Sequence, residues 1–212
     1  MKIPSLLLAV FLISPCLSIA DSSFPNPPVN AKELAVVEQY AQQGNSEAQF
    51  QLAMALRTGH LVKKNDELFI FWLLKAASSK HILAISNLSA AYLQGIGVPI
   101  DFEEAFKWAQ IAADNGNQSS QITLSNLYLD GKGVGRNYSA SYFWALLAAS
   151  HPRPKENIGA ILAWEDLTTQ AKILLEKSEA KLDQQTIIKL QNEVFLMKQN
   201  KPIAKPNKNY ST

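Results

Sequence analysis

The sequence predicts an all-α fold, a superhelical solenoid of antiparallel helix pairs with a repeat length of 36 residues. Three tryptophans, Trp72, Trp108 and Trp144, lie 36 residues apart, and two adjacent alanines follow each of them at the fourth and fifth positions. One glycine and one valine precede each tryptophan in the same phase: Gly59, Gly95 and Gly131, then Val62, Val98 and Val134. A period of about 20 to 50 residues is typical of stacked repeats, in which each unit buries its apolar face against the next.

The composition is that of a globular protein without a strong charge bias. The chain has 212 residues, of which 47% are hydrophobic and 18% charged, and its formal net charge is +2. This length supports one domain with a sizeable core. Because the tryptophans are in phase with alanines rather than interleaved with Lys or Arg, the sequence predicts aromatic core packing and no nucleic-acid partner.

The first segment, residues 1–20, has the layout of a secretory signal peptide. An apolar run over residues 6–13 follows a lysine, and a small-residue cleavage site ends at Ala20, so the mature chain is expected to begin at Asp21. We therefore expect an exported protein, either periplasmic or secreted. The single cysteine, Cys16, is either removed with this segment or is a lipid-attachment site, which the preceding proline disfavours. No later apolar run approaches the roughly 18 residues that a membrane span needs.

An arm and a half repeat come next. Residues 21–30 contain three prolines and no helical periodicity, which predicts an extended N-terminal arm. Residues 31–47 carry apolar side chains at helical spacing up to Gly44, a typical residue beyond a helix C-terminus, and predict a lone second helix. The apolar positions are Leu34, Val37, Tyr40 and Ala41.

Three full repeats follow, over residues 48–83, 84–119 and 120–155. The first helix of each ends at the in-phase glycine, which can adopt a positive φ. The second helix carries the tryptophan, and its small alanines allow two helices to approach closely, so we expect Trp108 to be a buried anchor. The residues expected to cap the second helices at their N-termini are Asn65, Asp101 and Asn137.

The C-terminal part departs from the period. Two prolines after His151 end the last repeat, and residues 156–199 predict helices that cap the open end of the stack. The pattern leaves open whether residues 156–181 form one helix or two, and Asp183 is the expected N-cap of the last helix. Residues 200–212 predict a disordered basic tail.

The middle repeat resembles the Sel-1-like repeat, a relative of the tetratricopeptide repeat, and the resemblance covers about residues 31–152. The in-phase residues that carry it are Ala84, Leu88, Tyr92, Gly95, Gly97, Val98, Asp101, Ala105, Trp108, Ala112, Ala113 and Gly116. The other two repeats depart from the pattern at Leu61, Phe69 and Lys80, and at Ser120, Ser141 and Pro152.

The resemblance implies an exported, non-catalytic scaffold or adaptor that binds a protein or peptide through its helical-repeat surface, in the cell envelope or at a host interface. Bacterial members of this family are often periplasmic, secreted or host-facing. The alternative is a secreted penicillin-binding or weak β-lactamase type within the same family. That type depends on cysteine pairs, which these repeats lack.

The sequence predicts no catalytic, cofactor or metal site. His60, His81 and His151 share no ligand spacing, and the glycine-rich turn at residues 131–135 lacks the Lys-Ser/Thr ending of a phosphate loop. The Ser-x-x-Lys motif at residues 178–181 stands without the other motifs of penicillin-recognising enzymes. We therefore expect neither an enzyme nor a bound cofactor.

Two surfaces are candidates for partner binding. The first is a groove on the side of the first helices, where related solenoids bind extended ligands: Gln51, Met54, Asn87, Ala90, Thr123 and Asn126. For Asn87 the alternative is a cap or a bridge between neighbouring helices. The second is an apolar stripe on the second helices of repeats one and three: Leu68, Phe71, Leu74, Phe143 and Leu146.

Repeat two has Glu104, Lys107 and Gln110 at the positions of this stripe. Polar residues of this kind are expected on a helix face that is exposed to solvent. We therefore expect the apolar version to be covered. Either the chain itself covers it, with the arm at residues 24–29 or a C-terminal helix, or a partner or a second copy does so, the latter giving a homodimer.

Overall fold

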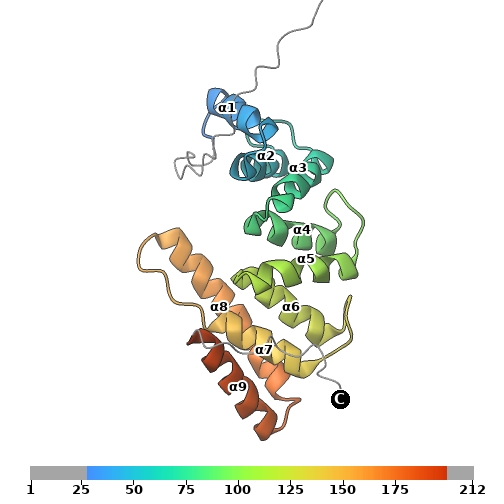
Figure 1. The fold of residues 1–212 in the computed structure, drawn as a ribbon, viewed down its shortest axis with the longest axis vertical. Helices are drawn as coiled ribbons and strands as arrows, with labels where there is room; N and C mark the ends of the chain where they lie inside the picture. The colour runs from blue at the N-terminus through green and yellow to red at the C-terminus, as the bar shows by residue number, and fades with distance from the viewer. Residues whose placement is uncertain (1–27, 200–212) are drawn as a thin grey trace, which may run out of the picture.

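The structure is a computed structural model and describes residues 28–199, which fold into nine α-helices with no strand among them. Figure 1 shows the helices stacked in chain order along one long axis, with α1 at one end and α9 at the other. The all-α solenoid prediction is confirmed. The segment expected to be a signal peptide, most of the predicted arm and the predicted basic tail lie outside the described residues. The helices are α1 (Ala31–Gln42), α2 (Ser46–Thr58), α3 (Asp66–Ser78), α4 (Ile82–Gln94), α5 (Phe102–Asp114), α6 (Gln118–Asp130), α7 (Tyr138–Ala149), α8 (Ile158–Glu179) and α9 (Gln184–Lys198).

Each second helix begins at its predicted cap. Oδ1 of Asn65 accepts a hydrogen bond from the backbone N–H of Leu68 at 2.9 Å, and Asp101 and Asn137 cap α5 and α7 in the same way. The first helices have caps that the sequence reasoning did not identify, namely Asn45, His81 and Asn117. A side-chain acceptor at each start satisfies backbone donors that have no partner within the helix.

The second turn glycine of a repeat permits contact with the repeat before it. Gly133 has φ 68°, and a Cβ there would lie 2.0 Å from the carbonyl oxygen of Phe102, at the start of α5. A Cβ at Gly97 would likewise lie 2.1 Å from the carbonyl oxygen of Asp66. The first repeat has Leu61 instead, which also adopts a positive φ but is exposed, so no neighbouring backbone excludes its side chain.

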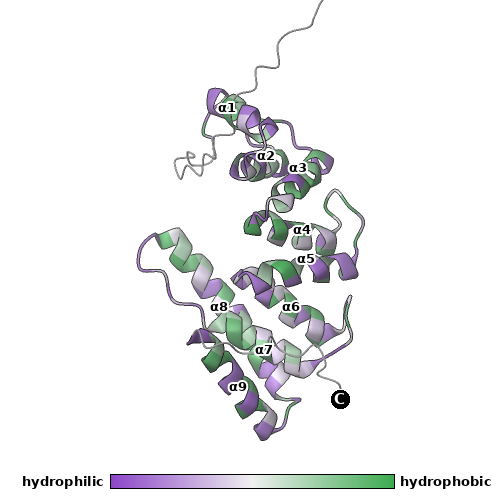
Figure 2. Cartoon of the chain, in the orientation of Figure 1, coloured by the Kyte–Doolittle hydropathy of each residue, from purple (hydrophilic) through white to green (hydrophobic). Residues whose placement is uncertain are grey.

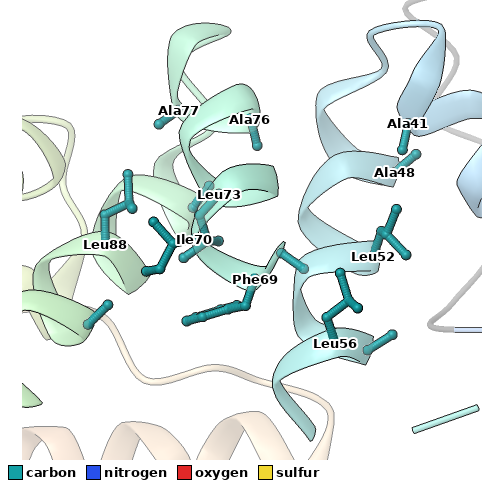
Figure 3. Close-up of a cluster of buried hydrophobic side chains, with 14 of the residues drawn as sticks. Ala41, Ala48, Leu52, Leu56, Phe69, Ile70, Leu73, Ala76, Ala77 and Leu88 are labelled. Carbon is teal, nitrogen blue, oxygen red and sulfur yellow. The ribbon is translucent and has the colours of Figure 1, made fainter. Parts of the chain in front are cut away.

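The core of the first two repeats lies between α2, α3 and α4 (Figure 3). Leucines and one phenylalanine fill its centre, and alanines stand where helix backbones approach one another, such as Ala48 on α2 and Ala76 on α3. Small side chains at these points allow the close packing that larger neighbours complete. The large residues are Leu52, Leu56, Phe69, Ile70, Leu73 and Leu88.

The tryptophans differ from expectation. Trp144 is buried, but Trp72 and Trp108 are only partly buried and pack against the core from its edge, so the prediction that Trp108 is a buried anchor is wrong. The in-phase position at the centre of the core is the next residue, occupied by Leu73, Ala109 and Ala145, all fully buried. Trp144 is buried as well because a later helix covers it.

The C-terminal segment forms one long helix followed by a shorter one, which answers the question that the sequence left open. The helix α8 is continuous over 22 residues and packs on α7 where the first helix of another repeat would lie. Its second half is buried through Ala171 and Leu174, whereas Ile158 and Leu162 in its first half are exposed. The helix α9, capped by Asp183 as predicted, packs against α7.

Candidate partner-binding surfaces

Two adjoining hollows lie along the first-helix side of the stack. The larger, of about 530 Å³, is lined by residues of α2 and α4 with two residues from neighbouring segments: Met54, Arg57, Thr58, Asn87, Ala90, Ala91, Gln94, Phe69 and Ile96. The smaller, of about 270 Å³, lies against α2: Pro28, Glu47, Phe50, Gln51, Met54, Ala55, Thr58 and His60. Met54 and Thr58 line both, so the hollows form one groove along α2, which we call the inner groove.

Four of the six predicted groove residues line this inner groove. Met54, Asn87 and Ala90 line the larger hollow, and Gln51 lines the smaller one. Thr123 and Asn126 lie one repeat further along, on α6, and line neither. Binding by any of these side chains stays a prediction.

The polar side chains of the groove are oriented by their own helices. The Nδ2 group of Asn87 donates to the carbonyl oxygen of Leu83 at 2.8 Å. Asn126, which lies outside the groove on α6, donates to the carbonyl oxygen of Ile122 in the same way at 3.1 Å. Thr58 Oγ1 donates to the carbonyl oxygen of Met54 at 2.9 Å. These bonds run one turn back along the same helix, so Asn87 neither caps a helix nor bridges to a neighbour through them.

The chain itself places a proline in this groove. Pro28 is buried against α2, where it lines the smaller hollow with Phe50 and Met54. Its carbonyl oxygen lies 3.1 Å from Nε2 of His60. A carbonyl group only accepts, so Nε2 of His60 carries the proton of this bond. The groove therefore offers an apolar wall and a hydrogen-bond donor to an extended backbone.

The apolar stripe divides between two different surroundings. On α3, Leu68, Phe71 and Leu74 are exposed, with Phe71 46% exposed. On α7, Phe143 is only 1% exposed, because α9 packs over it, and Leu146 is partly buried at the same contact. The chain's own C-terminal helix thus covers the α7 part of the stripe, and only the α3 part is open to a partner among residues 28–199.

The histidines have structural partners. His81 accepts a hydrogen bond from the N–H of Ala84 as the cap of α4, stacks on Phe50 at 4.8 Å between ring centroids, and lies 2.9 Å from a carboxylate oxygen of Glu47. Nε2 of His151 lies 2.9 Å from Oε1 of Gln121. Burial, and secondly the nearby Lys198 ammonium, lower the pKa of His151.

The serine of the Ser-x-x-Lys motif lies in the core, whereas Lys181 is exposed. Ser178 is fully buried, its Oγ donates to the carbonyl oxygen of Leu174 at 2.7 Å, and it lies 2.9 Å from Oγ of Ser141 on α7. This serine packs α8 against α7. A nucleophile must reach its substrate, which Ser178 in this position cannot do.

The remaining surfaces of residues 28–199 contain no group of three or more His, Cys, Asp or Glu side chains that could hold a metal ion. Within the same range, none of the helices is both long and apolar enough to cross a bilayer.

A stack of antiparallel helix pairs with a 36-residue period defines this protein as a helical-repeat protein. The family described as Sel1 repeat matches three segments, residues 46–81, 82–117 and 119–151. The first two each contain one complete helix pair, and the third contains α6 from its second residue onward together with α7. The chain belongs to the Sel1 repeat proteins, which generally are non-catalytic scaffolds that mediate protein interactions. The first two matched repeats begin two residues before the boundaries that the tryptophan phase suggested, and the third begins one residue before.

Solved structures agree with this family. The crystal structure of a Sel1 repeat protein from Oxalobacter formigenes is 29% identical in sequence, with a TM-score of 0.53 over 64% of this chain and 98% of that one. A second crystal structure, of c5321, a protective antigen present in uropathogenic Escherichia coli strains and displaying an SLR fold, is 25% identical, with a TM-score of 0.32. That alignment covers 85% of this chain and 46% of the antigen. No curated protein matches the chain.

Proposed function

We propose that this protein is an exported, non-catalytic scaffold whose inner groove binds an extended segment of a partner protein. The observation that carries the proposal is the position of Pro28, a non-helical residue of the chain itself that lies buried in the groove with its carbonyl oxygen at His60. The larger hollow continues beyond it along α2 to Asn87 and Ala90 on α4. A partner segment in this groove would place apolar side chains against Met54 and its backbone beside polar side chains.

The chemistry of the groove favours an extended, proline-containing segment. A proline ring has little conformational freedom to lose, and aromatic-lined grooves bind such segments in other proteins. Phe50 and Phe69 supply aromatic rings in the two hollows, and His60 supplies the donor that Pro28 uses. Three prolines of the chain itself fall within residues 25–28, so its own arm is a natural probe.

A peptide of residues 22–30 tests this chemistry. We expect it to bind a chain that begins at Val29 and so lacks Pro28, and we expect binding to weaken when His60 is changed to Ala or when the prolines of the peptide are changed to Ser. Fluorescence anisotropy measures both effects. Equal binding by the serine peptide would exclude a proline-selective groove.

Photo-crosslinking in the producing cells tests the scaffold role. A photoreactive residue at position 87 in the inner groove is expected to trap a partner protein. The same residue at position 107, exposed on the second helix α5 of repeat two, is the matched control and should not trap that partner. Identical adducts from both positions would contradict a role for the groove. Purified protein is expected to leave the β-lactam nitrocefin intact, consistent with the burial of Ser178.

Export is part of the proposal and rests on residues 1–20. The expected mature N-terminus is Asp21, in a protein that is periplasmic or secreted, and mass spectrometry of the intact protein from each cell fraction measures it. A mass that includes a diacylglyceryl group at Cys16 would instead identify a lipoprotein.

A further inference from the structure

Repeats one and three carry the same aromatic pair on their second helices, α3 and α7. The rings of Phe71 and Trp72 are 5.2 Å apart at an interplanar angle of 80°, and those of Phe143 and Trp144 are 5.3 Å apart at 84°. Both pairs are edge-to-face contacts, which aromatic rings prefer. Since the two pairs also occupy the same repeat position, α3 and α7 offer a packing helix the same aromatic pair and the same leucine three residues after the phenylalanine, whereas α3 has Leu68 and Lys75 where α7 has Ala140 and Leu147.

On α7 this surface is covered by an amphipathic helix. The helix α9 buries Ile187, Leu190 and Val194 in the cluster that contains Phe143 and Trp144, and Figure 1 shows it beside α7 at the end of the stack. These three residues follow the i, i+3, i+7 spacing of one helix face. Polar residues alternate with apolar ones over the rest of α9, as its alternating colours in Figure 2 show, and the apolar side chains that stay exposed there are Ile188, Phe195, Leu196 and Met197. Gln191 adds a hydrogen bond from Nε2 to Oη of Tyr142, at 3.0 Å.

On α3 no other segment of the described chain covers the corresponding surface. Leu68, Phe71 and Leu74 are each more than 40% exposed, and the Lys75 ammonium lies 5.3 Å from the centroid of the Phe71 ring. Repeat two shows that the solenoid does not require these apolar residues. It has Glu104 and Lys107 there, joined by an ion pair at 2.7 Å.

We propose that the outer face of α3, formed by Leu68, Phe71 and Leu74, binds an amphipathic helix of a partner protein, and that this helix packs as α9 packs on α7. The partner helix supplies three apolar side chains at the spacing of Ile187, Leu190 and Val194. Helices recognise one another in this way when an apolar face enters a matching hydrophobic surface. This site lies on a second helix of a repeat, whereas the inner groove is lined mainly by the first helices α2 and α4. The proposal is therefore independent of the function proposed above.

The α9 sequence provides the probe. A fluorescently labelled peptide of residues 183–199 is titrated with the full chain, and we expect saturable binding. The variant Leu68→Glu, Phe71→Lys, Leu74→Gln gives α3 the residues of repeat two and should therefore keep the fold, while weakening binding at least tenfold. Two controls accompany it: a peptide with Leu190→Asp, which should not bind, and the groove variant Asn87→Arg, which should bind normally.

Three outcomes would overturn the proposal. Undiminished binding to the triple variant would show that the peptide binds elsewhere, for example by displacing α9 from α7. A wild-type dimer that becomes a monomer in the triple variant, measured by light scattering, would make a second copy the occupant. A large fall in melting temperature, reproduced by Phe71→Lys alone, would mean that the chain covers this face itself. The proposal requires an unchanged melting temperature and an unchanged solution mass together with the loss of binding.

Discussion

At the scale of single residues, the position within the repeat explains what each side chain does, and small differences between copies have large consequences. Phe71 and Phe143 occupy the same position in their repeats, and each contacts the tryptophan that follows it, yet Phe71 is exposed and Phe143 is buried. Ser89 and Ser125, also 36 residues apart, both donate to a backbone carbonyl of the next helix, in Ala105 and Ser141. Such buried bonds join the two helices of a repeat, because an unpaired buried hydroxyl would be costly.

The turn glycines give a prediction with a matched control. Gly133→Ala should lower the free energy of unfolding by about 2 kcal/mol or more, because it places a Cβ against the Phe102 carbonyl oxygen in a left-handed conformation. Gly135→Ala, two residues on, meets nothing within 4 Å and should change stability by less than about 1 kcal/mol. Urea denaturation measures both. A neutral Gly133→Ala would contradict the close contact between repeats.

The tryptophans give a second prediction. Trp144→Ala should cost about 3 to 5 kcal/mol, from lost apolar burial and the cavity left behind. Trp108→Ala should cost about half as much, since this side chain is only partly buried. Trp108→Phe should be close to neutral, because Nε1 of Trp108 is buried without a hydrogen-bond partner among the described residues. If Trp108→Ala costs as much as Trp144→Ala in the same denaturation experiment, the assignment of Trp108 to the core edge is wrong.

At the scale of elements, the end of the stack depends on contacts between helices distant in the chain. His151, just beyond α7, lies beside Gln121 on α6, and its pKa is lowered by burial and by Lys198 on α9. The Lys198 ammonium also donates to the carbonyl oxygen of Ser150. The α6, α7 and α9 ends therefore meet around one titratable group.

This junction predicts a pH dependence. The folded-state pKa of His151 lies below its ordinary value of 6.5, so protons bind the unfolded chain more readily. The contribution of His151 to stability is therefore fully present above about pH 6.5 and is lost as the pH falls toward the folded-state pKa. We expect unfolding in urea at pH 7.5 and 5.5 to show a smaller loss of stability on acidification for His151→Gln than for the wild type. An equal loss in both proteins would rule out this contribution.

At the scale of the whole molecule, two regions of core meet at α5. Ala112 and Trp108 pack with the first region, while Ala109 and Ala113 belong to the second, so α5 faces both. A stack of this kind has mainly nearest-neighbour contacts, and its stability is close to a sum over repeats and their interfaces.

This arrangement predicts local rather than global loosening. Leu73→Ala, in the first region, should raise the rate of amide hydrogen exchange mainly in α2 to α4, whereas Leu190→Ala should raise it mainly in α7 and α9. Hydrogen exchange read by mass spectrometry compares the two variants. A uniform increase along the chain in either variant would show that the stack unfolds as one cooperative unit.

The sequence by itself determined the period, the helix pairs, the capping residues Asn65, Asp101 and Asn137, and the side of the stack on which a groove lies. These features are local: a cap acts within one turn of helix, and a turn glycine within a few residues. The same reasoning missed His81 as a cap because histidine is not among the usual capping residues. It also left open whether residues 156–181 form one helix or two, because a helical period does not show where a helix is interrupted.

Only the tertiary structure decided which copies of a repeated surface are buried. Phe71 and Phe143 both precede an in-phase tryptophan and stand three residues before a leucine, and these shared features do not show which of the two is covered. The difference comes from α9, which begins about 40 residues after Phe143 and packs on α7 rather than on α3. Whether an apolar side chain is buried depends on which distant segment reaches it, and that is settled by the packing of the whole chain and not by the repeat in which the side chain lies.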